Sequence, residues 1–370
     1  MVNGERIKQI RELLGWTQKE LGERIGAEQP VVAMMEGGRR QPTPEIIAAL
    51  VEQTKFPLSH FTQSDPCDFP LGSLLFRGPK TVTAKQQAIA HRFAQFTFDT
   101  IAPLRAKLTT IPLRIPRLES ETPASAARLT RSFLGLSPDG PVDNLTSVLE
   151  RSGVIVIAIP TEVEGRDAFS GWALDASVPV IALSAGRPTD RIRFSLAHEL
   201  GHLVMHQSVR GHIAEVERAA NEFAAEFLTP ADAIRPQLDP PLTLTTLAQL
   251  KLRWKVAIQS LIRRAKELGT ISQNQYEYLF KQISLRGWRT REPANLDPPP
   301  EVPRSLPEII RAAHGAQANL ETIAASGRVG VEFLRDVLEA HSAQSFLARG
   351  DAAGRKRRFA VVPGRKRADA

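Results

Sequence analysis

Residues 191–206 read RIRFSLAHELGHLVMH, and this stretch decides how the chain is interpreted. Its two histidines, His198 and His202, stand four residues apart, so in a helix they project from one face and can share a metal ion. Neutral imidazole suits zinc well. Glu199 would lie beside such a metal, where it can take a proton from the attacking water and pass it to the leaving amine. The stretch therefore predicts a helix over 189–205 carrying a zinc site of the HExxH type.

A second helix is predicted over residues 214–228, ended by a Thr-Pro pair at 229–230. A catalytic zinc site keeps one position open, so a third protein ligand has to come from another element. Glu217, Asn221 and Ala224 fall on one stripe of this helix, and a carboxylate there completes a His-His-Glu site. Against this stands chance, because the HExxH pattern fixes only three positions. The other acids of the helix are expected to be solvated: Glu215, Glu222 and Glu226.

The surroundings of the first motif carry three further expectations. Gly201 leaves room for another backbone or for a substrate to come close. His206, four residues after His202, is expected to approach the site without binding the metal. Arg191 and Arg193 are expected to form salt bridges with nearby carboxylates.

Composition excludes several classes of protein. No stretch approaches the roughly 20 apolar residues needed to cross a bilayer, and the charged N-terminus lacks the apolar stretch of a secretory signal. The single cysteine, Cys67, excludes an internal disulfide and a cysteine-rich zinc site. These observations predict a cytoplasmic protein without a membrane partner. The net charge is +8, but residues 349–370 hold eight Lys/Arg and two Asp, whereas residues 1–62 hold eight Lys/Arg and eight Glu. Bulk charge therefore does not argue for DNA binding.

The pattern along the chain predicts an α+β protein that is mostly helical. Short helices are expected over 5–60, a Pro- and Gly-rich linker over 63–80, and helices over 81–108, over 124–134 and ending near 151. Strands are expected over 153–159, 169–174 and 178–183, and two helices over 243–267, with exposed positive charge at Lys255, Arg263 and Arg264. The proline-rich stretch after 291 indicates that the compact region ends near Trp288, and the basic tail at 349–370 is expected to be disordered.

The paired motifs RIRFSLAHELGHLVMH and ERAANEFAAEFLTP closely resemble those of the ImmA/IrrE family of metallopeptidases. The upstream segment AFSGWAL…PVIALSAGRPTDRIRF and the helical segment from 247 to 293 are also similar to that family, so the resemblance covers about residues 124–293. It implies a zincin-like domain over 124–235, with a small sheet and the HExxH helix, and a helical module over 236–293. It further implies that His198, His202 and Glu217 bind zinc, that Mn²⁺ can replace zinc in vitro, and that Glu199 is the general base. The implied substrate is a helix-turn-helix repressor.

Residues 5–61 resemble the helix-turn-helix domain of the Xre/Cro family, which implies an all-α DNA-binding domain over 1–62. Thr17 is expected to cap the second helix in a capping box with Glu20. A third helix over 28–35 would enter the major groove. The small core is expected to contain Leu13, Leu14, Leu21, Ile25, Val32 and Met35.

The expected DNA contacts follow from side-chain chemistry. Gln29 is the best candidate for reading bases, because its amide can pair with adenine through two hydrogen bonds. Gln18, Arg39 and Arg40 suit phosphate contacts, which position the domain without specifying sequence. The family commonly has a serine and a basic residue where this chain has Ala33 and Met34, which thins the polar contact surface. A domain of this fold can instead dock a protein partner.

These features together predict a DNA-binding transcriptional regulator that is also a zinc endopeptidase, cleaving a helix-turn-helix repressor under stress or in a mobile element. The alternative is a DNA-binding regulator whose peptidase-like domain senses a ligand or binds a partner without proteolysis. An antitoxin-like protein is a third hypothesis, and a homodimer is expected if two half-sites are read. The predicted connector at 63–123 and the helices within 294–348 receive no role.

Overall fold

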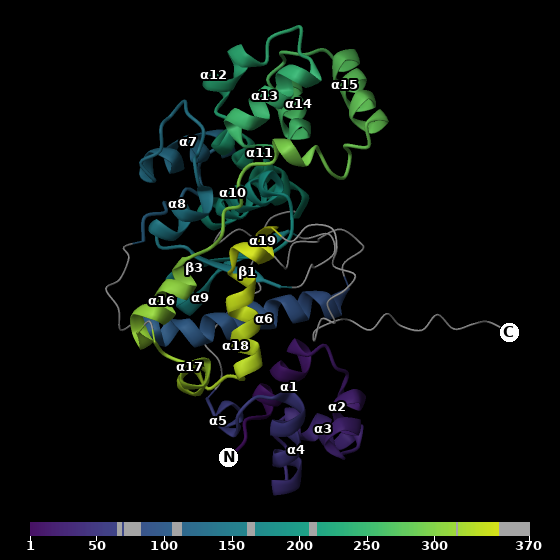
Figure 1. The fold of residues 1–370 in the computed structure, drawn as a ribbon, viewed down its shortest axis with the longest axis vertical. Helices are drawn as coiled ribbons and strands as arrows, with labels where there is room; N and C mark the ends of the chain where they lie inside the picture. The colour runs from purple at the N-terminus through teal and green to yellow at the C-terminus, as the bar shows by residue number, and fades with distance from the viewer. Residues whose placement is uncertain are drawn as a thin grey trace, which may run out of the picture.

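The computed structural model describes residues 1–64, 69, 83–105, 113–160, 167–206, 213–315 and 317–347. The basic tail and Cys67 lie outside these residues. The protein has the predicted α+β, mostly helical architecture, with a small sheet in the middle, the N-terminal helices at one end and α15 near the other (Figure 1). Within the described residues, no helix is long and apolar enough to cross a membrane.

The N-terminal helices form a small bundle, as predicted. They are α1 (Gly4–Leu13), α2 (Gln18–Ile25), α3 (Gln29–Glu36), α4 (Pro44–Thr54) and α5 (Leu58–Phe61). The capping box at the start of α2 is present, because the Thr17 hydroxyl accepts a hydrogen bond from Glu20 N and the Glu20 carboxylate accepts one from Thr17 N. The expected core residues are buried except for Leu14, which is half-buried.

The sheet has the order β1-β3-β2, with β1 (Ile155–Ile159) parallel and β2 (Ala168–Trp172) antiparallel to β3 (Val178–Ser184). All residues of β1 and β3 are buried, since helices cover both faces, and this explains the continuous apolar run in β1. The strand predicted over 169–174 is wrong at its end. Leu174 has a φ of 51°, which an extended strand cannot contain, and the short helix α9 (Ala173–Ala176) follows Trp172.

One face of the sheet carries the predicted metal helix, α10 (Thr189–Met205), which packs on β2, β3 and the next helix, α11 (Ile213–Leu228). A Cβ on Gly201 would lie 3.0 Å from the ring of Phe223. Phe223, rather than a backbone or a substrate, therefore occupies the space beside Gly201. This close packing brings α11 alongside the histidines of α10. The same side of the sheet includes α7 (Pro123–Phe133), α8 (Leu145–Arg151), α12 (Ala231–Ile234), α13 (Leu244–Trp254), α14 (Ile258–Glu267) and α15 (Gln273–Leu285).

The other face is covered by α6 (Ala84–Arg105) and by helices from the end of the chain. These are α16 (Ser305–His314), α17 (Leu320–Gly327), α18 (Val331–Ala340) and α19 (Ala343–Leu347). α16 and α18 pack on β1, and His341 accepts a hydrogen bond from Ala158 N of β1 at 3.1 Å. The expectation that the compact region ends near Trp288 is therefore wrong.

Buried acids explain why the proline-rich stretch is ordered. Glu301, which is 5% exposed, pairs with Arg193 of α10 and accepts a hydrogen bond from Thr146 N at 3.1 Å. Glu150 accepts hydrogen bonds from the backbone of residues 304 and 305. Composition marks this stretch as a linker, whereas its long-range ion pairs fasten it to the sheet region. The predicted division of the chain into domains otherwise stays a prediction.

The N-terminal bundle rests on α6, against which α1 packs. Arg6 pairs with Asp99 at 3.4 Å and Arg92 with Glu12 at 2.7 Å. The apolar core of the bundle belongs to one cluster with α6, one face of the sheet and the last helices. The N-terminal bundle and the sheet therefore share one apolar core.

Candidate metal centre and DNA-contact surface

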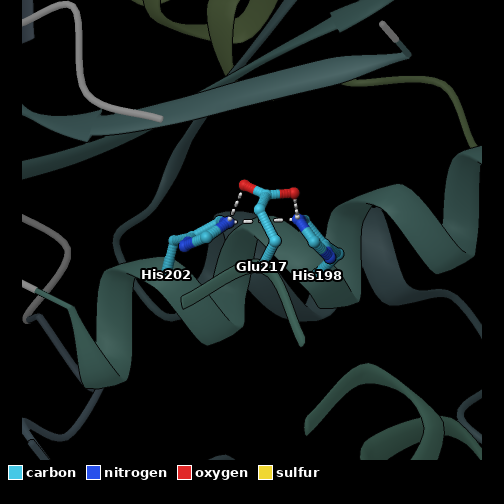
Figure 2. Close-up of side chains that lie close together, drawn as sticks. All are labelled: His198, His202 and Glu217. Atoms are coloured by element: carbon cyan, nitrogen blue, oxygen red, sulfur yellow. Dashed lines mark hydrogen bonds and ion pairs between the residues drawn. The ribbon is translucent and has the colours of Figure 1, made fainter. Parts of the chain in front are cut away.

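His198, His202 and Glu217 come together between α10 and α11 (Figure 2). The two Nε2 atoms are 3.0 Å apart. The Glu217 carboxylate reaches both, at 3.6 Å from His198 Nε2 and 3.4 Å from His202 Nε2. The histidine side chains are 15% and 4% exposed and that of Glu217 is 35% exposed, so the carboxylate lies on the open side of the cluster.

Hydrogen bonds fix the tautomer of His198. The Asn221 side-chain amide donates to Glu217 O at 2.8 Å, so its Oδ1 faces His198 Nδ1 at 3.1 Å. An acceptor at that point places the proton on Nδ1 and leaves Nε2 with a free lone pair. Burial lowers the pKa of His198, which keeps the ring neutral. Asn221 thus orients His198 so that its unprotonated Nε2 faces Glu217, as a metal ligand would require.

His206 supports the second histidine. Its Nδ1 lies 3.1 Å from Nδ1 of His202, and burial lowers the pKa of His206 to about 4. A neutral His206 can accept a hydrogen bond from Nδ1–H of His202, and in that tautomer Nε2 of His202 carries no proton. His206 therefore approaches the site as expected, by contacting His202.

The donor set fits zinc. Ligand atoms about 2.0–2.1 Å from a tetrahedral zinc ion lie about 3.3 Å from one another. The observed separations are 3.0, 3.4 and 3.6 Å. Three acceptors this close, two of them imidazole nitrogens, are best satisfied by a cation, and three protein ligands leave a fourth position open.

Glu199 is buried beside the cluster and has a partner that the sequence did not reveal. Ser170 of β2 donates to the Glu199 carboxylate at 2.6 Å, and both residues are buried. The serine fixes one carboxylate oxygen. A single hydroxyl in an apolar strand carries no spacing signal, so nothing in the sequence links Ser170 to a residue 29 positions away.

Of the remaining expectations around the site, those for Arg191 and Arg193 are confirmed and the one for Glu226 is wrong. Arg193 pairs with Glu301, and Arg191 pairs with Asp167, as expected for salt bridges. Glu226 is wrongly expected to be solvated, because it is 3% exposed and pairs with Arg264. Arg264 is correspondingly buried rather than exposed.

Glu217 and Asn221 line part of a cavity of about 860 Å³. Its lining comes mainly from α10, α11, the whole length of α14 and the segment 289–292. This volume is in the upper part of the range of about 300–1,000 Å³ typical of ligand pockets. One of the three candidate ligands, Glu217, therefore borders a space large enough for a polypeptide segment, whereas His198, Glu199 and His202 are not part of the lining.

At the other end of the molecule, Gln29 is exposed at the start of α3 and held by a chain of hydrogen bonds. Its Nε2 donates to Gln18 Oε1 at 2.8 Å, and Gln18 donates to Glu36 at 2.9 Å. Arg11 fixes the Glu36 carboxylate through contacts of 2.5 and 3.0 Å. The amide of Gln29 keeps its oxygen and one N–H free, as pairing with adenine requires.

Gln18 is half-buried and is engaged in holding Gln29, whereas Arg39 and Arg40 after α3 are exposed. The assignment of these side chains to DNA contacts stays a prediction.

Comparison with known proteins agrees with this geometry. Residues 149–266 match the metallopeptidase family M78, described as the IrrE N-terminal-like domain. Residues 7–61 match the helix-turn-helix family. The chain joins a helix-turn-helix domain to an IrrE-like domain. No curated protein matches it.

The IrrE-like match contains β1 to β3, both metal-motif helices and most of α14. It therefore includes the three candidate ligands, Glu199 and Ser170. The predicted ImmA/IrrE and Xre-type resemblance is confirmed at the level of these two domains. Along the chain, a metallopeptidase-family domain thus follows a helix-turn-helix domain, which belongs to a DNA-binding class.

Proposed function

We propose that the protein is a DNA-binding regulator and a zinc-dependent endopeptidase that cleaves a helix-turn-helix repressor. The observation that carries the proposal is the convergence of His198, His202 and Glu217 at ligand spacing, with Glu199 held beside them by Ser170. The repressor as substrate rests on the resemblance to the ImmA/IrrE family.

The side chains divide the work of peptide hydrolysis. Zinc, when bound, polarises the scissile carbonyl and lowers the pKa of water. His198, His202 and Glu217 would hold it, with Asn221 and His206 orienting the two imidazoles. Glu199 accepts the proton of the attacking water and returns it to the leaving nitrogen.

The test is incubation of the full chain, loaded with zinc, with the repressor encoded beside it. Glu199→Gln should bind zinc with unchanged stoichiometry and lose cleavage, because the amide cannot accept the proton. Glu215→Gln, on the exposed start of α11, is the matched control and should cleave like the parent. Cleavage by Glu199→Gln at the parental rate would refute the mechanism.

Ser170 supplies a finer test. Ser170→Ala removes one hydrogen bond to a charged carboxylate, which is worth about 1.5–3 kcal/mol. Turnover should fall by about tenfold or more while zinc stoichiometry stays constant. An unchanged turnover would mean that the contact at 2.6 Å does not position Glu199.

For the DNA-binding half, the exposed amide of Gln29 on its fixed network supports sequence-specific reading. A mobility-shift assay with the promoter of the adjacent gene tests this. Gln29→Ala should weaken binding by about 1–3 kcal/mol and relax specificity at one base pair. Gln53→Ala, an exposed glutamine of α4, serves as the control.

The cavity of about 860 Å³ beside the metal centre also supports the alternative, a regulator that senses a ligand without proteolysis. The alternative predicts operator binding that responds to a bound molecule and is indifferent to Glu199→Gln. If Glu199→Gln de-represses the target gene like the parent, the sensing hypothesis replaces proteolysis.

A further inference from the structure

The cavity beside the metal centre has an uneven distribution of charge on its walls. Each carboxylate in its lining has a basic partner: Asp167 faces Arg191, Glu222 faces Arg218, Glu267 faces Arg264 and Glu217 faces the site histidines, whereas Asp190, Glu292 and Asp297 share the single ammonium group of Lys251. Among the arginines in the lining, Arg263, Arg289 and Arg291 form no ion pair with any described residue. All three are exposed, so this part of the lining offers positive charge that is not paired with a described carboxylate.

Two of these arginines, Arg263 and Arg289, are held in place. Arg263 and Arg289 both lie over the ring of Phe280, at 5.8 and 5.5 Å from its centroid. Arg289 Nε also donates to Ser284 at 2.8 Å. Stacking on an aromatic ring restricts the side chain while leaving the terminal N–H groups free for a planar acceptor. The guanidinium groups of Arg263 and Arg289 are therefore arranged before any ligand binds.

The segment that carries Arg289 and Arg291 is fastened to the start of α14. Gln259 Nε2 donates to Trp288 O at 3.1 Å and to Arg289 O at 3.2 Å. On the other side of Arg291, the Glu292 carboxylate accepts from Ile258 N at 2.9 Å. Glu292 also satisfies the positive end of α14, so the attraction for an anion comes from the arginines.

We propose that Arg263, Arg289 and Arg291 form a subsite for acidic side chains of the polypeptide substrate. The inference rests on the proposed function, because the same cavity reaches Glu217 of the metal centre. A substrate segment lying in the cavity would place its Asp or Glu residues against this wall while another part of the chain reaches the zinc ligands. Arginine binds carboxylates through paired, charge-assisted hydrogen bonds.

Binding is tested with the zinc-loaded, full-length Glu199→Gln protein and short fluorescein-labelled peptides. The peptides differ only in a central Glu-Glu, Gln-Gln or Lys-Lys pair. Fluorescence anisotropy should show the Glu-Glu peptide binding about tenfold tighter than the Gln-Gln peptide, as expected for a hydrogen bond between charged groups. Arg289→Ala/Arg291→Ala, and separately Arg263→Ala, should remove this preference. Arg286→Ala is the matched control, because it changes an exposed arginine of the same region outside the cavity.

Charge reversal separates the subsite from the basic tail, which also attracts acidic peptides. Arg289→Glu/Arg291→Glu should prefer the Lys-Lys peptide. Equal binding of the Glu-Glu and Gln-Gln peptides, or a Glu-Glu preference that survives the reversal, would overturn the proposal.

Cleavage profiling distinguishes this inference from the proposed function. The parent protein, incubated with a mixture of peptides from a digested proteome, should cut sequences with Asp or Glu enriched at a fixed position from the cut. Cleavage without that enrichment overturns the subsite and leaves the peptidase intact. No cleavage, combined with charge-dependent binding that reverses in the Arg→Glu variant, refutes the peptidase and retains the subsite.

Discussion

Lys251 of α13 provides a quantitative prediction, because its ammonium group is completely buried among three carboxylates. It contacts Asp190 at the start of α10, Glu292 at 2.9 Å and Asp297 at 3.4 Å. Burial alone would lower the pKa of Lys251, but Asp190 and Glu292 outweigh it and the pKa is raised. The cluster holds a net charge of −2, and Lys251→Met would leave −3 in the same space.

Proton uptake limits the loss of unfolding free energy in Lys251→Met, because one proton bound to an aspartate of the cluster restores its net charge of −2. Protonating a carboxylate of ordinary pKa about 3.9 at pH 7 costs about 4 kcal/mol, at 1.36 kcal/mol per pH unit. This agrees with the roughly 3–5 kcal/mol found when one partner of a buried ion pair is removed. At pH 5 the same step costs about 1.5 kcal/mol, so the destabilisation should shrink as the pH falls.

Urea unfolding at pH 7 and pH 5, followed by tryptophan fluorescence and circular dichroism, measures both values. Lys281→Met is the control, because Lys281 is exposed on α15 and forms no ion pair with the described residues. A Lys251→Met penalty below about 1 kcal/mol at pH 7, or one equal at the two pH values, would refute this account.

Three further outcomes are expected. Asn221→Ala removes the hydrogen-bond acceptor of His198 Nδ1–H and should weaken zinc binding by about 10–100-fold in a chelator competition. An unchanged zinc affinity would contradict the assigned tautomer. Gly201→Ala places a methyl group 3.0 Å from Phe223 and should cost about 1–3 kcal/mol of unfolding free energy, and a neutral effect would show that α10 and α11 can separate freely. Burial lowers the pKa of His341 to about 4, below its value in the unfolded chain, so the contribution of His341 to the free energy of unfolding is complete above pH 6.5 and is lost as the pH falls towards 4, on the order of 3 kcal/mol in all. His341→Gln should therefore make the urea midpoint depend less steeply on pH. An equally steep dependence would point to other groups.

Local signals account for what the sequence predicted well. The helix of the HExxH motif has the predicted bounds, Thr189–Met205, and the capping box of Thr17 is present. Both depend on residues within a few positions of one another. Glu217 was placed by helical spacing and by the family resemblance together, and the structure brings it to both histidines.

Long-range contacts account for what the sequence did not reveal. Ser170 reaches Glu199 across 29 positions, and Arg193 reaches Glu301 across 108. Such pairs leave no periodic pattern, because each depends on where the chain returns after a turn or a crossover. Composition was misleading in the proline-rich stretch for the same reason, since a few buried acids outweigh its lack of backbone donors.

The N-terminal bundle shares one apolar core with α6 and with the face of the sheet that α6 covers, and this shared core holds the bundle in one orientation relative to the sheet. A bundle packed in this way cannot rotate freely relative to α10. If the bundle lies in a major groove, the opening of the cavity points to one side of the duplex. A repressor on neighbouring DNA would then meet it only at certain rotational positions, which recur every 10–10.5 base pairs or so. Moving the repressor's site by half a turn should hide the repressor behind the double helix, whereas a full turn should present it again.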